Sequence, residues 1–155
     1  MARNPTEKPY RVRHSAIHGR GVFAATTISK GALIIEYRGQ RTTWDVVSAR
    51  PDSDPENPEH TFIFETSDGT VIDGGRRGNA ARWMNHSCVP NCRSFEADDG
   101  RIYIEARRTI PEGEELTYDY RLSLDGRISK RTLAGYVCHC GARRCRGSLL
   151  VSAGK

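Results

Sequence analysis

The run RWMNHSCVPNC, residues 82–92, places two Asn, a His, a Ser and two Cys within the eight positions from 85 to 92. An apolar lead-in, Trp83 and Met84, runs directly into Asn, His, Ser and Cys residues. These residue types suit a metal site, a cysteine nucleophile or a ligand-binding turn. Cys88 with His86 as its base is one such nucleophile, since alternate residues of a strand share a face. No oxyanion-hole motif or orienting group accompanies this pair, which disfavours it.

The length and composition predict a single domain with a buried core. The chain has 155 residues, of which 37% are hydrophobic and 28% charged, within the usual range of one domain. No window approaches the roughly 18 apolar residues that a membrane span requires. The N-terminal segment lacks the apolar run of a signal peptide, so we expect an intracellular protein.

The charge balance is mildly basic, with 24 Lys and Arg against 19 Asp and Glu. Such a balance permits contact with nucleic acid without indicating it. The arginines form short pairs, at 76–77, 107–108 and 143–144, and no dense basic stripe. We therefore interpret the basic residues as solvated surface.

The five cysteines fall into two clusters, Cys88 and Cys92 and then the run CHCGARRC at 138–145. In a reducing compartment, metal binding is favoured over disulfides. The second cluster offers three thiolates, whereas a structural zinc site needs four ligands. His139 is a poor fourth ligand, because in an extended C-x-C its side chain points away from both sulfurs. Cys88 or Cys92 is then the obvious donor, and free buried cysteines are the alternative.

Apolar patterning predicts a mainly β protein built from short pieces. A helix is expected at 42–50, with Thr42 or Thr43 as its cap and Pro51 as its stop, and one or two helical turns are expected at 78–85. The expected strands cover residues 10–13, 22–24, 32–39, 61–65, 70–73, 92–97, 101–106 and 115–120.

One sequence pattern occurs twice. Residues 27–31 (TISKG) and 109–113 (TIPEG) each precede a strand that contains an acidic residue beside a tyrosine. In both, glycine stands where a positive φ is expected. A duplicated corner explains the pattern structurally, and the functional interpretation is that both strands bring a tyrosine to one place.

Several weak motifs occur together in a fixed order. The G-x-G of IHGRGVFA, for example, indicates a tight turn but no dinucleotide fold. Together they resemble the SET-domain protein-lysine methyltransferases with a post-SET zinc segment, above all the trithorax-type and bacterial stand-alone members. The resemblance covers nearly all of residues 10–150. Its motifs are HGRGVFA, GALIIEYRG, VIDGGRRGNAARWMNHSCVPNC, EGEELTYDY and CHCGARRCRG.

The resemblance implies a fold of small, curved β-sheets with pseudoknot-like threading near the NHSC run. S-adenosylmethionine would occupy a cleft on one side, and the target lysine would enter a narrow channel from the other. The implied organisation is a flexible tail at 1–9, a SET domain at 10–121 with an insert at about 41–78, a connector at 122–137 and a post-SET zinc segment at 138–151.

The resemblance also implies site residues. Tyr120 would be the catalytic tyrosine, Tyr37 would line the lysine channel, and Tyr118 would tune the product state, towards mono- or dimethylation. Phe62 stands where relatives often carry Tyr, and Gln40 where they carry Glu. One structural zinc would be held by Cys88, Cys138, Cys140 and Cys145, with Cys92 packed in the core. The cofactor would be contacted by His18, Gly19, Arg20, Gly21, Phe62, Arg82, Trp83, Asn85, His86, His139 and Leu149.

Methyl transfer needs a neutral amine, and this requirement fits the residue types. Free Lys has a pKa near 10.4, so neutrality at pH 7 costs roughly 4.6 kcal/mol. A sulfonium about 4 Å away would repel the ammonium by on the order of 4 kcal/mol at an effective dielectric near 20. Burial adds to this effect, so no strong protein base is required.

The expected partner is a lysine-containing protein, such as a histone H3 tail or a basic bacterial protein, and neither membrane nor nucleic acid is required. A bacterial member could act in its own cytoplasm or as a secreted effector in a host nucleus. Two rival interpretations stay open. One is a catalytically silent module that binds lysine tails, and the other is a basic, zinc-stapled nucleic-acid binder.

Overall fold

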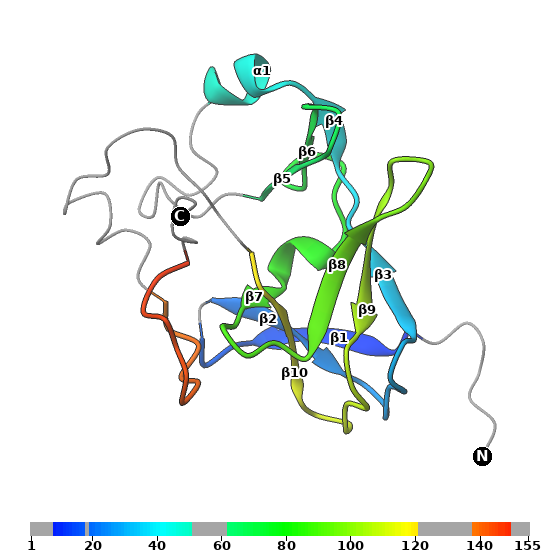
Figure 1. Ribbon diagram of the computed structural model, residues 1–155, viewed down its shortest axis with the longest axis vertical. Coiled ribbons are helices and arrows are strands. Elements are labelled where there is room, and N and C mark those ends of the chain that lie inside the picture. Colours follow the sequence, from blue (N-terminus) through cyan, green and yellow to red (C-terminus); the bar gives the residue numbers. More distant parts are fainter. Residues whose placement is uncertain (1–7, 18, 51–61, 121–137, 150–155) are drawn as a thin grey trace.

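The computed structural model describes residues 8–17, 19–50, 62–120 and 138–149. Most of the expected tail, the loop at 51–60, the connector at 122–137 and His18 lie outside these residues. Within them the chain forms three small β-sheets, which confirms the mainly β expectation (Figure 1). No helix in the described ranges is long and apolar enough to cross a membrane.

The first sheet contains four strands in the order β1-β2-β10-β7, and its last pair is parallel. This pairing sets Thr117 beside Asn85 and Tyr118 beside His86. Two segments thirty residues apart therefore lie side by side, so the NHSC run adjoins the tyrosine-bearing strand. The strands are β1 (Tyr10–His14), β2 (Arg20–Ala24), β7 (Asn85–His86) and β10 (Glu115–Tyr118).

The second sheet has the order β3-β9-β8, with strands β3 (Leu33–Glu36), β8 (Cys92–Glu96) and β9 (Ile102–Ala106). Buried and half-buried residues alternate along β9, as expected of a strand with one face on the core. The strand predicted over 32–39 ends early, at Glu36. Gly39 passes so close to the neighbouring backbone that a Cβ there would lie 2.3 Å from the Asp73 carbonyl oxygen, and the chain turns into a different sheet.

The third sheet has the order β4-β6-β5, with strands β4 (Gln40–Thr42), β5 (Ile63–Glu65) and β6 (Val71–Asp73). Helix α1 (Trp44–Ser48) follows β4, with Thr43 accepting the cap hydrogen bond, and buries none of its side chains. It is shorter than the predicted 42–50. The guanidinium of Arg50 donates to Asp73 at 2.6 Å and to Gln40 at 2.5 Å. Gln40, which stands where relatives often carry Glu, therefore still makes a side-chain contact at this edge of the third sheet.

A 3₁₀ turn, η1 (Ala80–Trp83), replaces the one or two helical turns expected at 78–85. Asn79 caps it, and the backbone is extended from Met84 onward. The strand β7 that follows was not predicted, because two residues show no periodicity.

The repeated corner is confirmed as one structural unit. Ile28 and Ile110 exchange two backbone hydrogen bonds of 2.8 Å and are both buried. The glycines that follow them have positive φ, 84° at Gly31 and 89° at Gly113. The two corners pair with each other, so the strands that leave them start from a common point.

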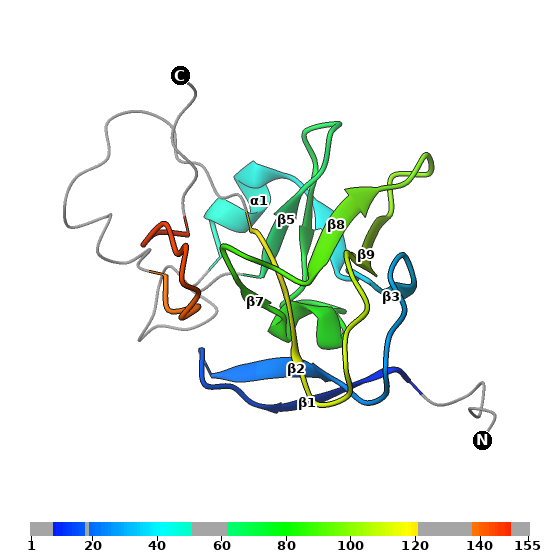
Figure 2. The ribbon, with the colours of Figure 1, turned by 60° about the horizontal axis from the view of Figure 1, so that its bottom comes forward.

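One hydrophobic core draws on all three sheets, with Ile72 of β6 contributed by the third. The largest fully buried side chains are Val22, Val71, Met84, Cys92, Ile102, Ile104, Ile110 and Leu116. The segment 138–149 lies beside this body rather than in its sheets (Figure 2).

Candidate functional site

Three tyrosines from the two related strands gather around Phe64. Its ring centroid lies 5.2 Å from that of Tyr37 and 6.4 Å from that of Tyr118. The Tyr118 and Tyr120 rings are 5.0 Å apart. The expectation that two strands bring tyrosines to one place is therefore confirmed. Phe64 itself was missed, although its spacing from Phe62 by two strand positions was a usable signal.

Main-chain acceptors fix two of the phenols. The Tyr37 hydroxyl donates to the Phe62 carbonyl oxygen at 2.7 Å. The Tyr120 hydroxyl donates to the carbonyl oxygen of Met84, and the Tyr120 backbone N–H donates to His86 Nδ1 at 3.0 Å. The residue before β5 therefore positions Tyr37, and the segment from Met84 to His86 positions Tyr120.

The surroundings keep the phenols neutral. Burial raises the pKa of Tyr37, Tyr118 and Tyr120 above the ordinary value of 10.0. For Tyr37, the other two tyrosines raise the pKa further. Since the charged forms are disfavoured, these groups act as hydrogen-bonding dipoles rather than as bases.

Two arginines and two aromatic rings form a second cluster beside the tyrosines. Trp83 has the guanidinium of Arg82 4.7 Å and that of Arg20 5.3 Å from its ring centroid. Phe62 meets Trp83 edge to face at 5.3 Å. The Arg82 Nε atom is buried without a hydrogen-bond partner. An unpaired buried donor beside an aromatic face suits a polar ligand with a flat ring. Four of the predicted cofactor residues, Arg20, Phe62, Arg82 and Trp83, therefore lie together in one cluster.

Asn85 lies beneath this cluster and ties it to the first sheet. Its Nδ2 donates to the Arg20 carbonyl oxygen at 3.0 Å and to Glu115 at 2.9 Å. A Cβ at Gly21 would lie 2.5 Å from the same Glu115 carboxylate, so glycine there makes room for this network. Gly19 is exposed and has a φ of 45°, which a tight turn requires.

His86 and Cys88 do approach each other, with Nε2 and Sγ 3.4 Å apart. Burial lowers the His86 pKa to about 4, although Asp119 acts to raise it. Burial also raises the pKa of the Cys88 thiol. Because Nδ1 accepts from the Tyr120 N–H, a neutral His86 carries its proton on Nε2, the nitrogen that faces Cys88. This nitrogen cannot accept the thiol proton as a base must, so the geometry disfavours the nucleophile hypothesis.

Cys88 instead joins the three cysteines of the C-terminal segment. The four Sγ atoms lie within 4.8 Å of one another, and Cys88 Sγ is 3.7 Å from that of Cys138 and 3.9 Å from that of Cys145. Tetrahedral zinc with bonds of about 2.3 Å would separate its sulfurs by about 3.8 Å. The four residues predicted to bind zinc therefore fit a zinc site.

The sulfur environment supports the same conclusion. A backbone N–H group approaches each of the four sulfurs at 3.3–3.5 Å, from Arg146 to Cys88, Cys140 to Cys138, Ala142 to Cys140 and Gly147 to Cys145. Although burial acts to raise the Cys140 pKa, such contacts lower it to about 6. Metal-binding cysteines must be thiolates, so this environment suits a cation.

Cys92 is separate from this cluster, as predicted. It is fully buried in the core, and burial raises its pKa to about 12. All five cysteines are described and none forms a disulfide.

Arg146 connects the cysteine segment to the tyrosine strand and was missed by the sequence prediction. Its guanidinium donates to both Asp119 oxygens, at 2.8 and 3.0 Å. Asp119 also lies 3.5 Å from His86 Nδ1. The signal that could have revealed this bridge was the position of Arg146, directly after Cys145, opposite the acidic residue of TYDY.

No contact between described residues brings the remaining predicted cofactor residues to the arginine and aromatic cluster. His139 is exposed, and Leu149 is half-buried with its carbonyl oxygen accepting from Arg146 at 3.0 Å. His18 lies outside the described residues.

Comparison with known proteins agrees with this geometry. The model of a family described as "SET domain" matches residues 19–121. The chain is 39% identical over 139 residues to the protein named histone-lysine N-methyltransferase trithorax of Drosophila virilis, covering 87% of this chain and 3% of that one. It is 37% identical over 147 residues to an H3 lysine-4 specific histone-lysine N-methyltransferase of Emericella nidulans, covering 92% and 12%. It is 39% identical over 138 residues to human histone-lysine N-methyltransferase 2B, covering 87% and 5%. The chain therefore spans only a small part of each relative.

Proposed function

The chain belongs to the SET-domain family, and we propose that it is a protein-lysine N-methyltransferase that uses S-adenosylmethionine. The observation that carries the proposal is the convergence of Tyr37, Tyr118 and Tyr120, which are held neutral by burial and lie next to a cation-aromatic cluster. Because neutral phenols orient an amine without adding charge, this arrangement suits alignment of a lysine for displacement.

The tyrosines would receive the lysine side chain in a dry channel. Burial there favours the neutral amine, the form that reacts. Tyr120, fixed at its backbone by His86 and at its hydroxyl by Met84, would orient the reacting atoms, and Tyr37 would line the channel. A site of this kind lowers the barrier mainly by positioning and by fixed dipoles.

The cofactor would be held by the cluster around Trp83, together with Asn85 and His86. When bound, S-adenosylmethionine supplies the methyl group from its sulfonium. Arg82, with its unpartnered Nε, would bond a polar group of the cofactor, and Trp83 would contact a flat or cationic part. The Phe62 ring packs edge to face against Trp83. Unlike the Tyr that relatives often carry at this position, Phe62 has no hydroxyl for the cofactor. His18, Gly19, Gly21, His139 and Leu149 are the further contacts in this proposal.

One zinc would bind the four clustered cysteines and give the segment 138–151 its fixed position. Apart from the sulfurs, the described attachment of this segment to the body runs mainly through Arg146 and Asp119. Four thiolates around a metal would add most of the remaining stability.

Tyr118 would limit the product to mono- or dimethyllysine. Its phenol can hold a water or the amine and leaves less space for a methylated nitrogen than Phe would. Mass spectrometry of a methylated peptide tests this assignment. We expect Tyr118→Phe to shift the product towards higher methylation, and a dominant trimethyl product from the native enzyme would contradict it.

We base the proposed substrate class on the names of the relatives. Their names specify histone lysines, so we propose a lysine in a basic tail, of a histone or of a comparable bacterial protein. We also propose that the protein works inside a cell, its own or a host's.

A calorimetric titration with S-adenosylmethionine tests the cofactor assignment. We expect one binding site per chain, weakened by Arg82→Gln and unaffected by Arg11→Gln on the exposed strand β1. Absence of binding by the native protein would overturn the proposal. A panel of histones and basic bacterial proteins, analysed by peptide mapping, would then identify the substrate.

A further inference from the structure

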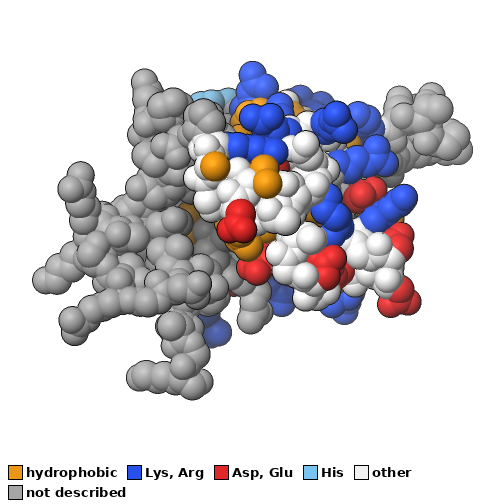
Figure 3. All heavy atoms as spheres, turned by 90° about the horizontal axis from the view of Figure 1, so that it is seen from above, with side chains coloured by type: hydrophobic (Ala, Val, Ile, Leu, Met, Phe, Trp, Pro, Cys, Tyr) orange, Lys and Arg blue, Asp and Glu red, His pale blue; other side chains and the backbone are white. Residues whose placement is uncertain are grey.

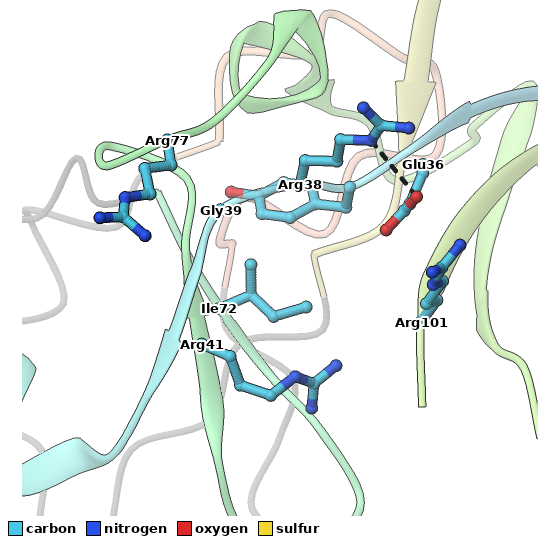
Figure 4. A pocket seen from close by; sticks show the side chains of 8 residues that line it. Glu36, Arg38, Gly39, Arg41, Ile72, Arg77 and Arg101 are labelled. Atoms are coloured by element: carbon cyan, nitrogen blue, oxygen red, sulfur yellow. Dashed lines mark hydrogen bonds and ion pairs between the residues drawn. The ribbon is translucent and has the colours of Figure 1, made fainter. Parts of the chain in front are cut away.

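Four arginines line a cavity whose wall also includes Tyr37, but the arginines have no part in the proposed methylation. The cavity, of about 310 Å³, opens beside the connection between β3 and β4. Arg38 comes from this connection, Arg41 from β4, Arg77 from the loop after β6, and Arg101 from the residue directly before β9. Figure 4 shows Arg77 and Arg101 on opposite sides of the cavity, with Ile72 between them.

The positive charge of this cavity exceeds its negative charge. Glu36 is its one acidic lining residue, 3.3 Å from the Arg38 Nε atom. The Arg101 side chain, 60% exposed, has a loose ion pair of 3.6 Å with Asp99 outside the cavity. Lys and Arg also gather on one side of the face that Figure 3 shows. An anion entering here would meet more guanidinium groups than carboxylates.

The four arginines differ in how firmly they are held. Arg41 is fixed by hydrogen bonds to Thr66, Thr70 and the Gly100 carbonyl oxygen. It therefore shapes the cavity wall. Arg77, by contrast, makes no hydrogen bond or ion pair within the described part of the chain, and its five N–H groups are free for a ligand.

The backbone at Arg77 is in an unfavourable conformation. Its φ is 56°, and among the described residues every other positive φ belongs to glycine. The backbone around it is closely packed, because a Cβ at Gly78 would lie 1.9 Å from the Gly74 carbonyl oxygen and the Gln40 backbone N–H donates to the Arg76 carbonyl oxygen at 2.8 Å. Glycine would suit position 77 better on conformational grounds, so an arginine there indicates a function for its side chain.

We propose that this cavity binds the dianion of a phosphate monoester, from a small phosphorylated compound or a phosphorylated side chain. Guanidinium groups match phosphate oxygens in pairs, and clusters of arginine are a recurrent phosphate-binding arrangement. The four arginines line a single cavity, whereas binding of a nucleic-acid backbone needs an extended basic stripe. The proposal does not depend on methyl transfer.

Calorimetry on the full chain at fixed ionic strength tests the proposal with four probes. These are inorganic phosphate, a phosphoserine peptide, the same peptide with Glu in place of phosphoserine, and a short DNA duplex. The variants are Arg77→Gln, Arg101→Gln and Arg77→Gly, with Arg13→Gln on the exposed strand β1 as the matched control. The melting temperature of each variant is recorded alongside.

We expect saturable binding of one phosphate group per chain, weakened about tenfold by Arg77→Gln or Arg101→Gln, as for loss of one charge-assisted hydrogen bond, and unchanged by Arg13→Gln. Arg77→Gly should lose binding without lowering the melting temperature. Tighter binding of the peptide than of inorganic phosphate would show that the natural ligand is a phosphorylated side chain. Tighter binding of inorganic phosphate than of the peptide would show that it is a small phosphorylated compound. Lack of saturation, equal binding of the Glu peptide, equal weakening by Arg13→Gln or preference for the duplex would each overturn the proposal.

Discussion

The tyrosine site and the cysteine cluster are built in opposite ways. Tyr37 and Tyr118 are more than nine-tenths buried and are positioned by strands of the common core. Three of the four clustered cysteines belong to a separate segment, and Cys88, Cys140 and Cys145 remain partly exposed. The tyrosine site is therefore formed by packing in the core together with hydrogen bonds to main-chain acceptors, whereas the cysteine segment depends on a few polar contacts and, in our proposal, on a metal.

The largest expected effect is on the methyl-transfer rate, through a change in the tyrosine site. Tyr120→Phe should lower the methyl-transfer rate by about a hundredfold or more, as removal of a preorganised hydrogen-bonding group does. The fold should lose only about 1 kcal/mol, because one hydrogen bond to Met84 disappears. Rate assays, thermal unfolding and cofactor calorimetry check this. An equal loss of cofactor binding would assign Tyr120 a different role.

Removing the metal should loosen the cysteine segment and leave the packed region folded. Chelation or Cys140→Ser should increase hydrogen exchange in residues 138–149 and lower activity by roughly tenfold or more, in the range that loss of metal support gives. Strands β7 and β10 should stay protected. Metal analysis should find one zinc per chain in the native protein and in the control Cys92→Ala, whose thiol lies in the core. A native protein without zinc would refute the site.

A smaller effect is expected at the bridge between the regions. Arg146→Ala removes the paired hydrogen bonds to Asp119, and loss of about 1 kcal/mol there corresponds to about a fivefold fall in activity. Arg146→Lys should recover little, because an ammonium cannot bond both oxygens in the same plane. Full activity in both variants would show that the bridge is dispensable.

The smallest effect concerns alkaline pH. Burial places the pKa of Tyr37, Tyr118 and Tyr120 above 10.0, so above pH 10 the unfolded chain releases phenolic protons that the folded chain keeps. The free energy of unfolding should therefore be unaffected by these groups below pH 10 and should fall as the pH rises beyond it. In a phenolate absorbance titration, these three of the six tyrosines should ionise only with unfolding. Early ionisation of all six would contradict their burial.

Sequence patterns predicted the strands whose apolar residues alternate or cluster, such as β9, and the duplicated corner at Ile28 and Ile110. They left the fourth zinc ligand open, because spacing alone does not tell Cys88 from Cys92. The structure favours Cys88, which lies with the three cysteines of the C-terminal segment, while Cys92 is buried in the core.

The features that the sequence did not reveal depend on contacts between distant segments. Strand β7 has two residues and no pattern, and the bond between Arg146 and Asp119 joins positions 27 apart. The arginines were interpreted as solvated surface, yet positions 38, 41, 77 and 101 line one cavity. Charge patterning along the chain carries no information on such convergence.

The most direct test of the proposed function is mass spectrometry of a lysine-containing histone or bacterial protein after incubation with the zinc-loaded enzyme and S-adenosylmethionine bearing an isotopically labelled methyl group. We predict that the label appears on a lysine Nζ and is nearly absent with Tyr120→Phe. Binding of the cofactor and of a lysine-containing tail, with no label on any lysine, would instead show a catalytically silent binding module and contradict the proposal.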